Sequence, residues 1–315
     1  MRVLVLGGLG FVGRAVCGAL GRSGLDVVSA SRAQQARGTF NRHVSLDRRD
    51  EGQLATALRD LEPDILVDLA CYQPAEVEAV VRNFSGARYI FMSTGVYPNL
   101  FGKTAREGEF TPLEGDVPLG DLDYMDAKRW CETVLARSLE LPWTVIRPPA
   151  IFGARDHTLR IAAYMERIGD GGPLLVPLET YEWRAGCAWV HDVGRVTAQA
   201  CDLGRSTNHR AYNVSFGDVT FRAILEAFGE ALERPVRLAP IPHAELPEGA
   251  SPYGPNPVRS AGYHIERAHR ELGFEPSSLQ AAVADTVAWY RDQHPSHPGY
   301  AGRAEELVIA ERTLG

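Results

Sequence analysis

The feature that most constrains this chain is a glycine-rich turn that begins at the seventh residue. A short apolar run, Val3–Leu6, leads directly into Gly7-Gly8-Leu9-Gly10-Phe11-Val12-Gly13. The run has the composition of a central strand that is buried on both faces of a parallel sheet. After the turn, apolar residues recur at helical spacing as far as Leu20, and Gly24 lies just beyond. A strand, a glycine turn and a helix in this order predict the first unit of an α/β fold.

The glycines of this turn have the spacing of a dinucleotide-binding motif. Gly7, Gly10 and Gly13 satisfy GxxGxxG. Glycine at these positions allows a tight turn, close approach of a pyrophosphate to the backbone, and close packing of the helix on the strand. The first helical amides, at Phe11 and Val12, would then face the phosphates with support from the helix dipole. The strand-to-helix context makes the turn a candidate dinucleotide site.

Strands and helices alternate along the first half of the chain. Further strands are predicted at 26–31, 64–70, 88–92 and 143–147, with helices at 53–61, 77–84 and 124–139. This alternation predicts an α/β fold with a Rossmann-type doubly wound parallel sheet. Beyond Pro149 the alternation becomes irregular, which favours a smaller, interleaved C-terminal substrate lobe.

These patterns suggest a division of the chain. Residues 1–152, with returning segments at about 187–216, form the predicted NAD(P)-binding Rossmann domain. Residues 153–186 and 217–293 form the predicted substrate-binding lobe, with helices expected at 220–232 and 279–291. Residues 294–315 form a C-terminal tail without evident chemistry, in which a helix is expected at 303–313.

The end of the second predicted strand bears on which dinucleotide is bound. An acid there would hydrogen-bond the adenosine ribose 2′-hydroxyl, whereas a basic residue would pair with a 2′-phosphate. Ser31 and Arg32 occupy this position, and Asp26 lies at the opposite end of the strand. We therefore predict NADP(H) as the preferred cofactor and keep NAD(H) as the alternative, since Arg32 could equally be a solvated surface residue.

A tyrosine and a lysine form the predicted catalytic pair. In Tyr124-Met-Asp-Ala-Lys128 the two side chains share one face of a predicted helix. A nearby ammonium and the positive ring of an oxidised nicotinamide both favour the phenolate form of a tyrosine. Tyr124 could then exchange a proton with an alcohol or ketone while hydride moves to or from the nicotinamide, and Lys128 could also hold the nicotinamide ribose. The pair predicts an NAD(P)-dependent oxidoreductase.

Two hydroxyl residues, Ser93 and Thr94, follow the predicted strand at 88–92. Ligands of open α/β sheets bind at the carboxyl ends of the strands. A hydroxyl at this place could orient a substrate oxygen toward Tyr124. The alternative is an ordinary strand-end turn, in which Ser and Thr are common.

Taken together, these motifs resemble the extended short-chain dehydrogenase/reductase family, also called the NAD-dependent epimerase/dehydratase family. The resemblance runs from residue 1 to about residue 293. It rests on the glycine turn, Asp47, Ala70, Ser93-Thr-Gly-Val-Tyr97, Tyr124-x-x-x-Lys128, Arg147-Pro148 with Gly153, Trp189-Val-His-Asp-Val193 and the segment 265–276.

The resemblance implies roles for individual residues. Ser93 matches the family's catalytic Ser/Thr, Tyr124 the acid/base and Lys128 its partner, while Asp47 would contact the adenine and Ala70 would line the cofactor site. It also implies hydride transfer on a secondary alcohol or ketone, above all of a nucleotide-linked sugar, by a ketoreductase or an epimerase.

In nucleotide-sugar members of the family, basic residues of the second lobe bind the pyrophosphate. Arg184 and Arg259 are the candidates here, and both could equally be surface arginines. Gly95 follows Thr94 where 4,6-dehydratases carry an acidic pair, which disfavours that reaction. Pro98 resembles a subgroup with RNA-associated, partly non-catalytic members, so a non-catalytic NADP-binding or RNA-associated protein is the alternative function.

Composition narrows the location and the partners. The net charge of −7 and the pI of about 5.8 argue against a nucleic-acid partner. The five cysteines lack a CxxC pair and are expected in the core of a protein from a reducing compartment. No apolar run approaches the ~18 residues of a membrane span. We expect a cytoplasmic protein with a small-molecule substrate and no metal, and a possible homodimer through the helix at 124–139.

Overall fold

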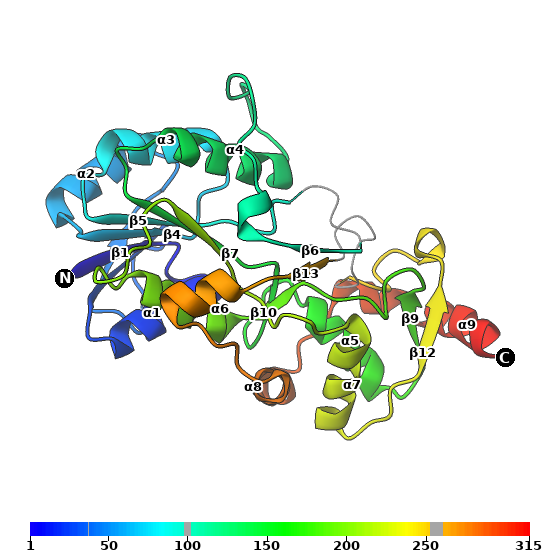
Figure 1. The fold of residues 1–315 in the computed structure, drawn as a ribbon. Helices are drawn as coiled ribbons and strands as arrows, with labels where there is room; N and C mark the ends of the chain where they lie inside the picture. Colours follow the sequence, from blue (N-terminus) through cyan, green and yellow to red (C-terminus); the bar gives the residue numbers. More distant parts are fainter. Residues whose placement is uncertain (37, 98–101, 253–260) are drawn as a thin grey trace.

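The computed structural model describes residues 1–36, 38–97, 102–252 and 261–315. In this part of the chain a seven-stranded parallel sheet forms the centre of the molecule (Figure 1). Its order is β11-β7-β5-β4-β1-β2-β3. The strands are β1 (Arg2–Leu6), β2 (Asp26–Ser31), β3 (Arg42–Ser45), β4 (Ile65–Asp68), β5 (Arg88–Met92), β7 (Trp143–Arg147) and β11 (Arg210–Asn213).

Helices cover both faces of this sheet, so the predicted doubly wound α/β fold is confirmed (Figure 1). One face carries α1 (Phe11–Arg22) and α6 (Val190–Ala200), and the other carries α2 (Glu51–Leu61), α3 (Pro74–Asn83) and α4 (Tyr124–Arg137). Each face has its own apolar core, because the central strands are buried on both sides.

The other elements lie mostly beyond the central sheet. The helices are α5 (Arg160–Gly169), α7 (Phe221–Leu232) and α8 (Leu279–Gln293), which pack around buried Tyr164, Phe221 and Phe228. Short parallel pairs join β8 (Ala150–Phe152) to β10 (Cys187–Trp189), β9 (Leu174–Pro177) to β12 (Leu238–Ile241), and β6 (Lys103–Ala105) to β13 (Ala261–Tyr263). Single helical turns stand at Glu107–Glu109, His243–Glu245, Ala268–Leu272 and Pro298–Gly302.

The C-terminal tail is fastened to the rest of the chain. Its helix α9 (Arg303–Leu314) begins at the predicted residue and packs against β9 and β12. Glu306 accepts two hydrogen bonds from Arg167, and both side chains are almost fully buried. Arg303 adds an ion pair to Asp170 at 2.7 Å. A buried ion pair of this kind is costly to break from one side, so the tail has a structural part in the fold.

Some expected boundaries differ from the structure. Helix α3 begins at Pro74 rather than Val77, because Pro74 fits the first helical turn and Glu76 accepts hydrogen bonds from preceding backbone amides. Helix α4 ends at Arg137 rather than Leu139, since Ser138 leaves the helical conformation. All five cysteines are buried, as expected.

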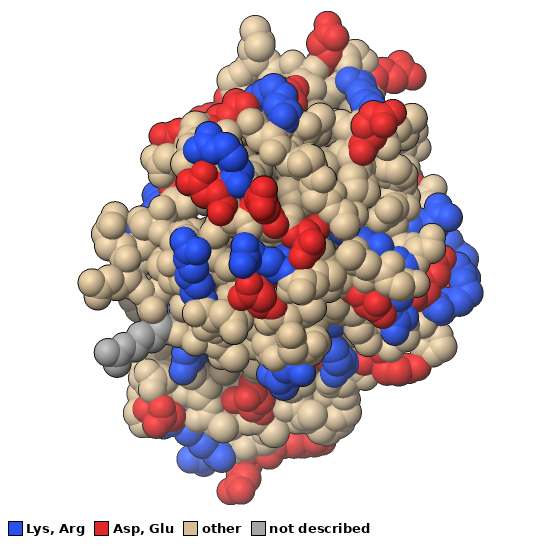
Figure 2. Space-filling model, turned by 90° about the vertical axis from the view of Figure 1, so that its left-hand side faces the viewer, with Lys and Arg blue, Asp and Glu red and all other residues tan. Residues whose placement is uncertain are grey.

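Two features concern possible partners: the length and polarity of the helices, and the distribution of charge on the surface. None of the described helices is both long enough and apolar enough to cross a membrane. On the face shown in Figure 2, Lys and Arg side chains are interspersed with Asp and Glu.

Candidate active site

The glycine turn is built as its sequence predicts. Gly7 has a φ of 82°, a conformation that favours glycine, and its carbonyl accepts a hydrogen bond from the Gly10 amide at 3.0 Å. A Cβ on Gly13 would lie 2.1 Å from the Gly7 carbonyl oxygen. Helix α1 therefore packs so close to the end of β1 that no other residue fits at this position.

The start of α1 is free to meet an anion. Its N-cap residue, Gly10, offers no side-chain cap, and its first turn holds no acid. The first amides of a helix lack partners within the helix and carry the positive end of its dipole. This arrangement suits a phosphate.

A cavity of about 360 Å³ opens above the turn. It brings together all of the predicted cofactor residues except Tyr124 and Lys128. The predicted residues that line the cavity are Gly7, Gly10, Phe11, Val12, Gly13, Ser31, Arg32, Asp47 and Ala70. The other lining residues are Leu6, Ala30, Leu46, Arg48, Arg49, Leu69, Tyr72 and His157.

The end of the cavity near β2 and β3 is basic. Arg32 and Arg49 are exposed, and the Asp47 carboxylate accepts a hydrogen bond from the Arg49 amide at 3.0 Å. Arg48 is buried and pairs with Asp68 at 2.6 Å. Its Nη1 atom has no hydrogen-bond partner among the described residues. An unpartnered buried donor beside a cavity is costly, and an acceptor on a bound ligand would remove that cost.

Tyr124 lies beside the mouth of this cavity. It is the first residue of α4, whose N-terminus is capped by the Asp123 carboxylate. Its ring lies 6.5 Å from the ring of Tyr72, which lines the cavity, and the side chain remains about half exposed. The phenol is thus open to a ligand.

Lys128 is buried beneath Tyr124 on the same face of α4. Its ammonium lies 5.9 Å from the centre of the Tyr124 ring and donates to the carbonyls of Cys71 and Met92, at 2.7 and 2.8 Å. These carbonyls follow the end of β4 and close β5, so Lys128 ties α4 to the carboxyl edge of the sheet. The ribose contact expected for Lys128 would have to be made in addition to these bonds or in exchange for one.

The hydroxyl of Ser93 points into the protein. It donates to Glu132 at 2.6 Å, and Glu132 is itself paired with buried Arg147. The neighbouring Thr94 is only partly buried. The predicted substrate contact of Ser93 would therefore require the Glu132 bond to be shared or exchanged.

This pair of Glu132 and Arg147 was not predicted from the sequence. Glu132 follows Lys128 by four residues, so a charged residue on the buried face of the predicted helix was the available signal. The network continues to Tyr97, whose hydroxyl accepts from Arg147 at 2.8 Å and donates to Asn213 at 2.7 Å. Burial raises the pKa of Tyr97 to about 12. The network fixes the segment after β5 to α4 and β7.

Of the two predicted second-lobe arginines, Arg184 is described by the structure and does not line the cavity. Arg184 pairs with Asp218 at 3.0 Å and donates to the Thr104 hydroxyl at 2.6 Å. Arg259 and Pro98 lie outside the described residues. A substrate-binding role for either arginine stays a prediction.

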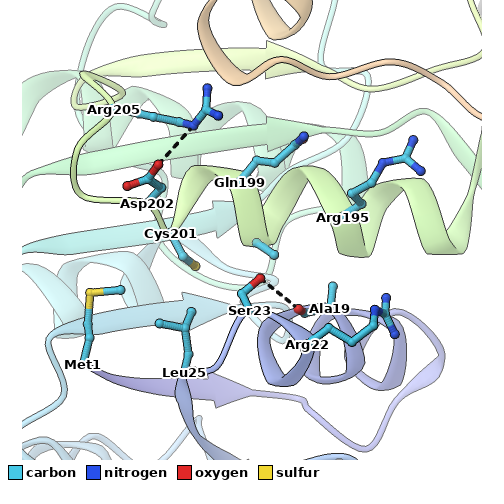
Figure 3. A pocket seen from close by; sticks show the side chains of 11 residues that line it. Met1, Ala19, Arg22, Ser23, Leu25, Arg195, Gln199, Cys201, Asp202 and Arg205 are labelled. Atoms are coloured by element: carbon cyan, nitrogen blue, oxygen red, sulfur yellow. Dashed lines mark hydrogen bonds and ion pairs between the residues drawn. The ribbon is translucent and has the colours of Figure 1, made fainter.

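A larger cavity, of about 500 Å³, lies between the C-terminal ends of α1 and α6 (Figure 3). None of the predicted site residues that the structure describes lines it. Two of its arginines have structural partners: Arg195 pairs with Asp192 at 2.8 Å, and Arg205 pairs with Asp202 at 3.3 Å. Because α1 runs back along the sheet from the glycine turn, this cavity is at the opposite edge from the candidate site.

Comparison with known proteins gives a family match for residues 3–79 and solved structures of similar fold for most of the chain. Residues 3–79 match the NAD dependent epimerase/dehydratase family, and no curated protein matches the sequence. A similar solved structure is the UDP-glucose 4-epimerase of Thermotoga maritima with UDP-glucose, at 21% identity and a TM-score of 0.70, covering 94% of this chain and 100% of that one.

Two further solved structures contain NAD. The UDP-glucose 4-epimerase of Thermus thermophilus with NAD has 22% identity and a TM-score of 0.66, covering 93% of this chain and 100% of that one. The UDP-glucuronic acid 4-epimerase of Bacillus cereus with UDP-glucuronic acid and NAD has 16% identity and a TM-score of 0.66, covering 93% and 99%. At these identities the likeness shows a shared fold.

Proposed function

Because residues 3–79 match the NAD dependent epimerase/dehydratase family and the chain has the fold of solved epimerases, we propose that this protein is a nicotinamide-dinucleotide enzyme that acts on a secondary alcohol or ketone of a nucleotide-linked sugar. One observation carries the proposal: the cavity above the glycine turn is bordered by Tyr72, and the exposed Tyr124 phenol lies beside it.

The lining of the cavity supports this proposal through the packing of the turn and through its polar groups. The backbone of Gly7 and Gly8 occupies the space that a Cβ on Gly13 would fill, so α1 begins directly beside the turn, and no side chain of its N-cap residue caps it. Arg48 has an unused donor beside the end of β3, and Asp47 can accept a hydrogen bond there. The pyrophosphate would be held by the α1 amides and the adenosine by residues after β2 and β3.

The chain's own residues would handle the proton. A bound nicotinamide supplies the hydride donor or acceptor. The Tyr124 phenol would exchange a proton with the substrate oxygen, and Lys128 would keep the start of α4 against the carbonyls of Cys71 and Met92. The part-buried Thr94 is available to hydrogen-bond the same substrate oxygen, whereas Ser93 would first have to release Glu132.

The preference for NAD or NADP depends on a few side chains near the ends of β2 and β3. The comparison structures that contain a dinucleotide contain NAD, and they give the NADP preference no support. That preference depends on Arg32 at the end of β2, with Arg49 as a second cation near the cavity. NAD(H) is thus the cofactor with the broader support, and NADP(H) remains a prediction to be measured.

The substrate class follows from the same comparisons. UDP-glucose and UDP-glucuronic acid are bound in two of the similar structures, so a sugar linked to a nucleoside diphosphate is the proposed substrate here. Epimerisation would show tightly held cofactor without net redox turnover. Ketoreduction would consume exchangeable reduced cofactor.

The test is turnover of the protein with NAD or NADPH on UDP-glucose, UDP-glucuronic acid and UDP-4-keto sugars. Tyr124→Phe is expected to lower turnover by about 10²- to 10⁴-fold, because it removes only the proton-transferring group. NADH affinity should stay the same. Tyr290→Phe, at a part-buried tyrosine of α8, is the matched control. Full turnover in Tyr124→Phe would refute the assigned chemistry.

A further inference from the structure

We propose that His157, in the segment between β8 and α5, is a phosphate-binding residue of the dinucleotide cavity. This inference rests on the proposed dinucleotide function. Among the described residues that line the cavity, all but His157 lie within the first 72 residues, and His157 comes from the segment after β8. Sequence patterns gave no signal for it, because the residue stands in an irregular stretch.

The backbone that presents His157 is held in an unfavourable conformation. Arg155 has a φ of 70° and Leu159 a φ of 54°, and neither is a glycine. Such conformations cost roughly 1 kcal/mol or more each and cluster at ligand clamps. Gly153, at the start of the turn, has a φ of 151°, and a Cβ there would meet Val190 at 2.6 Å.

The residues on either side of His157 fix this turn. Asp156 is buried, and its carboxylate accepts bonds from the Thr158 amide and hydroxyl, at 2.9 and 2.7 Å. The Leu159 amide donates to the Asp156 carbonyl at 3.2 Å. An Asx turn of this type fixes the backbone locally. The imidazole itself is exposed, and no hydrogen bond to it is found among the described residues.

The sheet order indicates which part of the dinucleotide His157 meets. It follows β7 and β8, so its segment approaches the cavity from the β7–β5–β4 side. The adenosine residues Arg32 and Asp47 follow β2 and β3 on the other side of β1. A side chain that arrives from β4 meets the nicotinamide half or the pyrophosphate before the adenosine end, and His157 lines the cavity together with the glycine turn, where the pyrophosphate would be bound.

The distribution of cations around the cavity is consistent with a phosphate contact for His157. The described lining cations, Arg32, Arg48 and Arg49, are all at the adenosine end, and Arg48 is neutralised by Asp68. Near the glycine turn, the phosphates would otherwise meet backbone amides and the helix dipole alone. An imidazole N–H donates well to a phosphate oxygen and adds no permanent charge repulsion to a hydride-accepting ring.

The test compares three probes, NADH, ADP and adenosine, by calorimetric titration of wild-type, His157→Ala, His157→Gln and Arg160→Ala protein. Arg160 is an exposed cation at the start of α5 that does not line the cavity. His157→Ala should weaken NADH and ADP about tenfold, leave adenosine unchanged, and leave the unliganded Tm unchanged. His157→Gln should recover part of the loss, and Arg160→Ala should match wild type.

The other outcomes overturn the assignment. Equal weakening of adenosine would make His157 a structural residue, and weakening of NADH alone would move its contact to the nicotinamide half. If wild type binds NADH and His157→Ala binds it equally well, the inference fails while the proposed function stands. If wild type binds no dinucleotide, the proposed function itself fails.

Discussion

Two glycines of α1 provide a matched test of the dinucleotide turn. Gly13 and Gly18 lie on the same helix and both are buried, yet a methyl group would meet very different surroundings. At Gly13 the added Cβ would lie 2.1 Å from the Gly7 carbonyl oxygen and 2.7 Å from Gly8 Cα. At Gly18 the nearest atom is the mobile end of Arg22, at 3.6 Å.

The magnitudes follow from these contacts. In Gly13→Ala the helix must move by about 1 Å for the shortest contact to become tolerable, and overpacking of this kind costs about 1–3 kcal/mol. The same movement displaces the α1 amides from the cavity, so NADH should bind at least about tenfold more weakly. In Gly18→Ala the loss of backbone freedom in the unfolded chain should stabilise the protein by about 0.5–1 kcal/mol.

Urea unfolding and NADH titration of the three proteins give the required values. Gly18→Ala should unfold at higher urea concentration than wild type and bind NADH equally. Gly13→Ala should lose both stability and affinity. The reasoning is refuted if Gly13→Ala binds NADH as tightly as wild type, because the close approach of helix and turn would then have no part in binding.

Two further changes test the charge assignments. Arg32→Ala should weaken NADPH about tenfold and spare NADH in parallel titrations; equal effects on both would make Arg32 an ordinary surface residue. Glu132→Ala should destabilise the protein by about 3–5 kcal/mol in urea unfolding, because it leaves the Arg147 guanidinium buried without a counter-charge, and adding Arg147→Met should recover most of that loss. A cost under about 1 kcal/mol for Glu132→Ala would show that the pair is not a tightly buried one.

The sheet was predictable because its strands have simple signals. The bounds of β2, β5 and β7 agree with the predicted ones, since each strand is an apolar or β-branched run between turn residues. The glycine turn could also be predicted from the sequence, because only glycine fits at position 13. These features depend on contacts between residues close together in the sequence.

The rest depends on contacts that span long stretches of chain. The strand β3 has a half-exposed, mixed sequence, and α5 begins in a strained turn at Leu159 without a capping residue. The bond from Ser93 to Glu132 and the contribution of His157 to the cavity join segments that only the folded chain brings together. The predicted roles of Ser93 and Lys128 overlooked competing partners inside the protein, which no local motif reveals.

A crystal structure of the protein with NAD tests the central claim most directly. The account predicts a pyrophosphate against the first amides of α1, and a nicotinamide ring beside Tyr124 with room for a sugar carbon between ring and phenol. A dinucleotide bound at another place, or a nicotinamide turned away from the Tyr124 phenol, would contradict it.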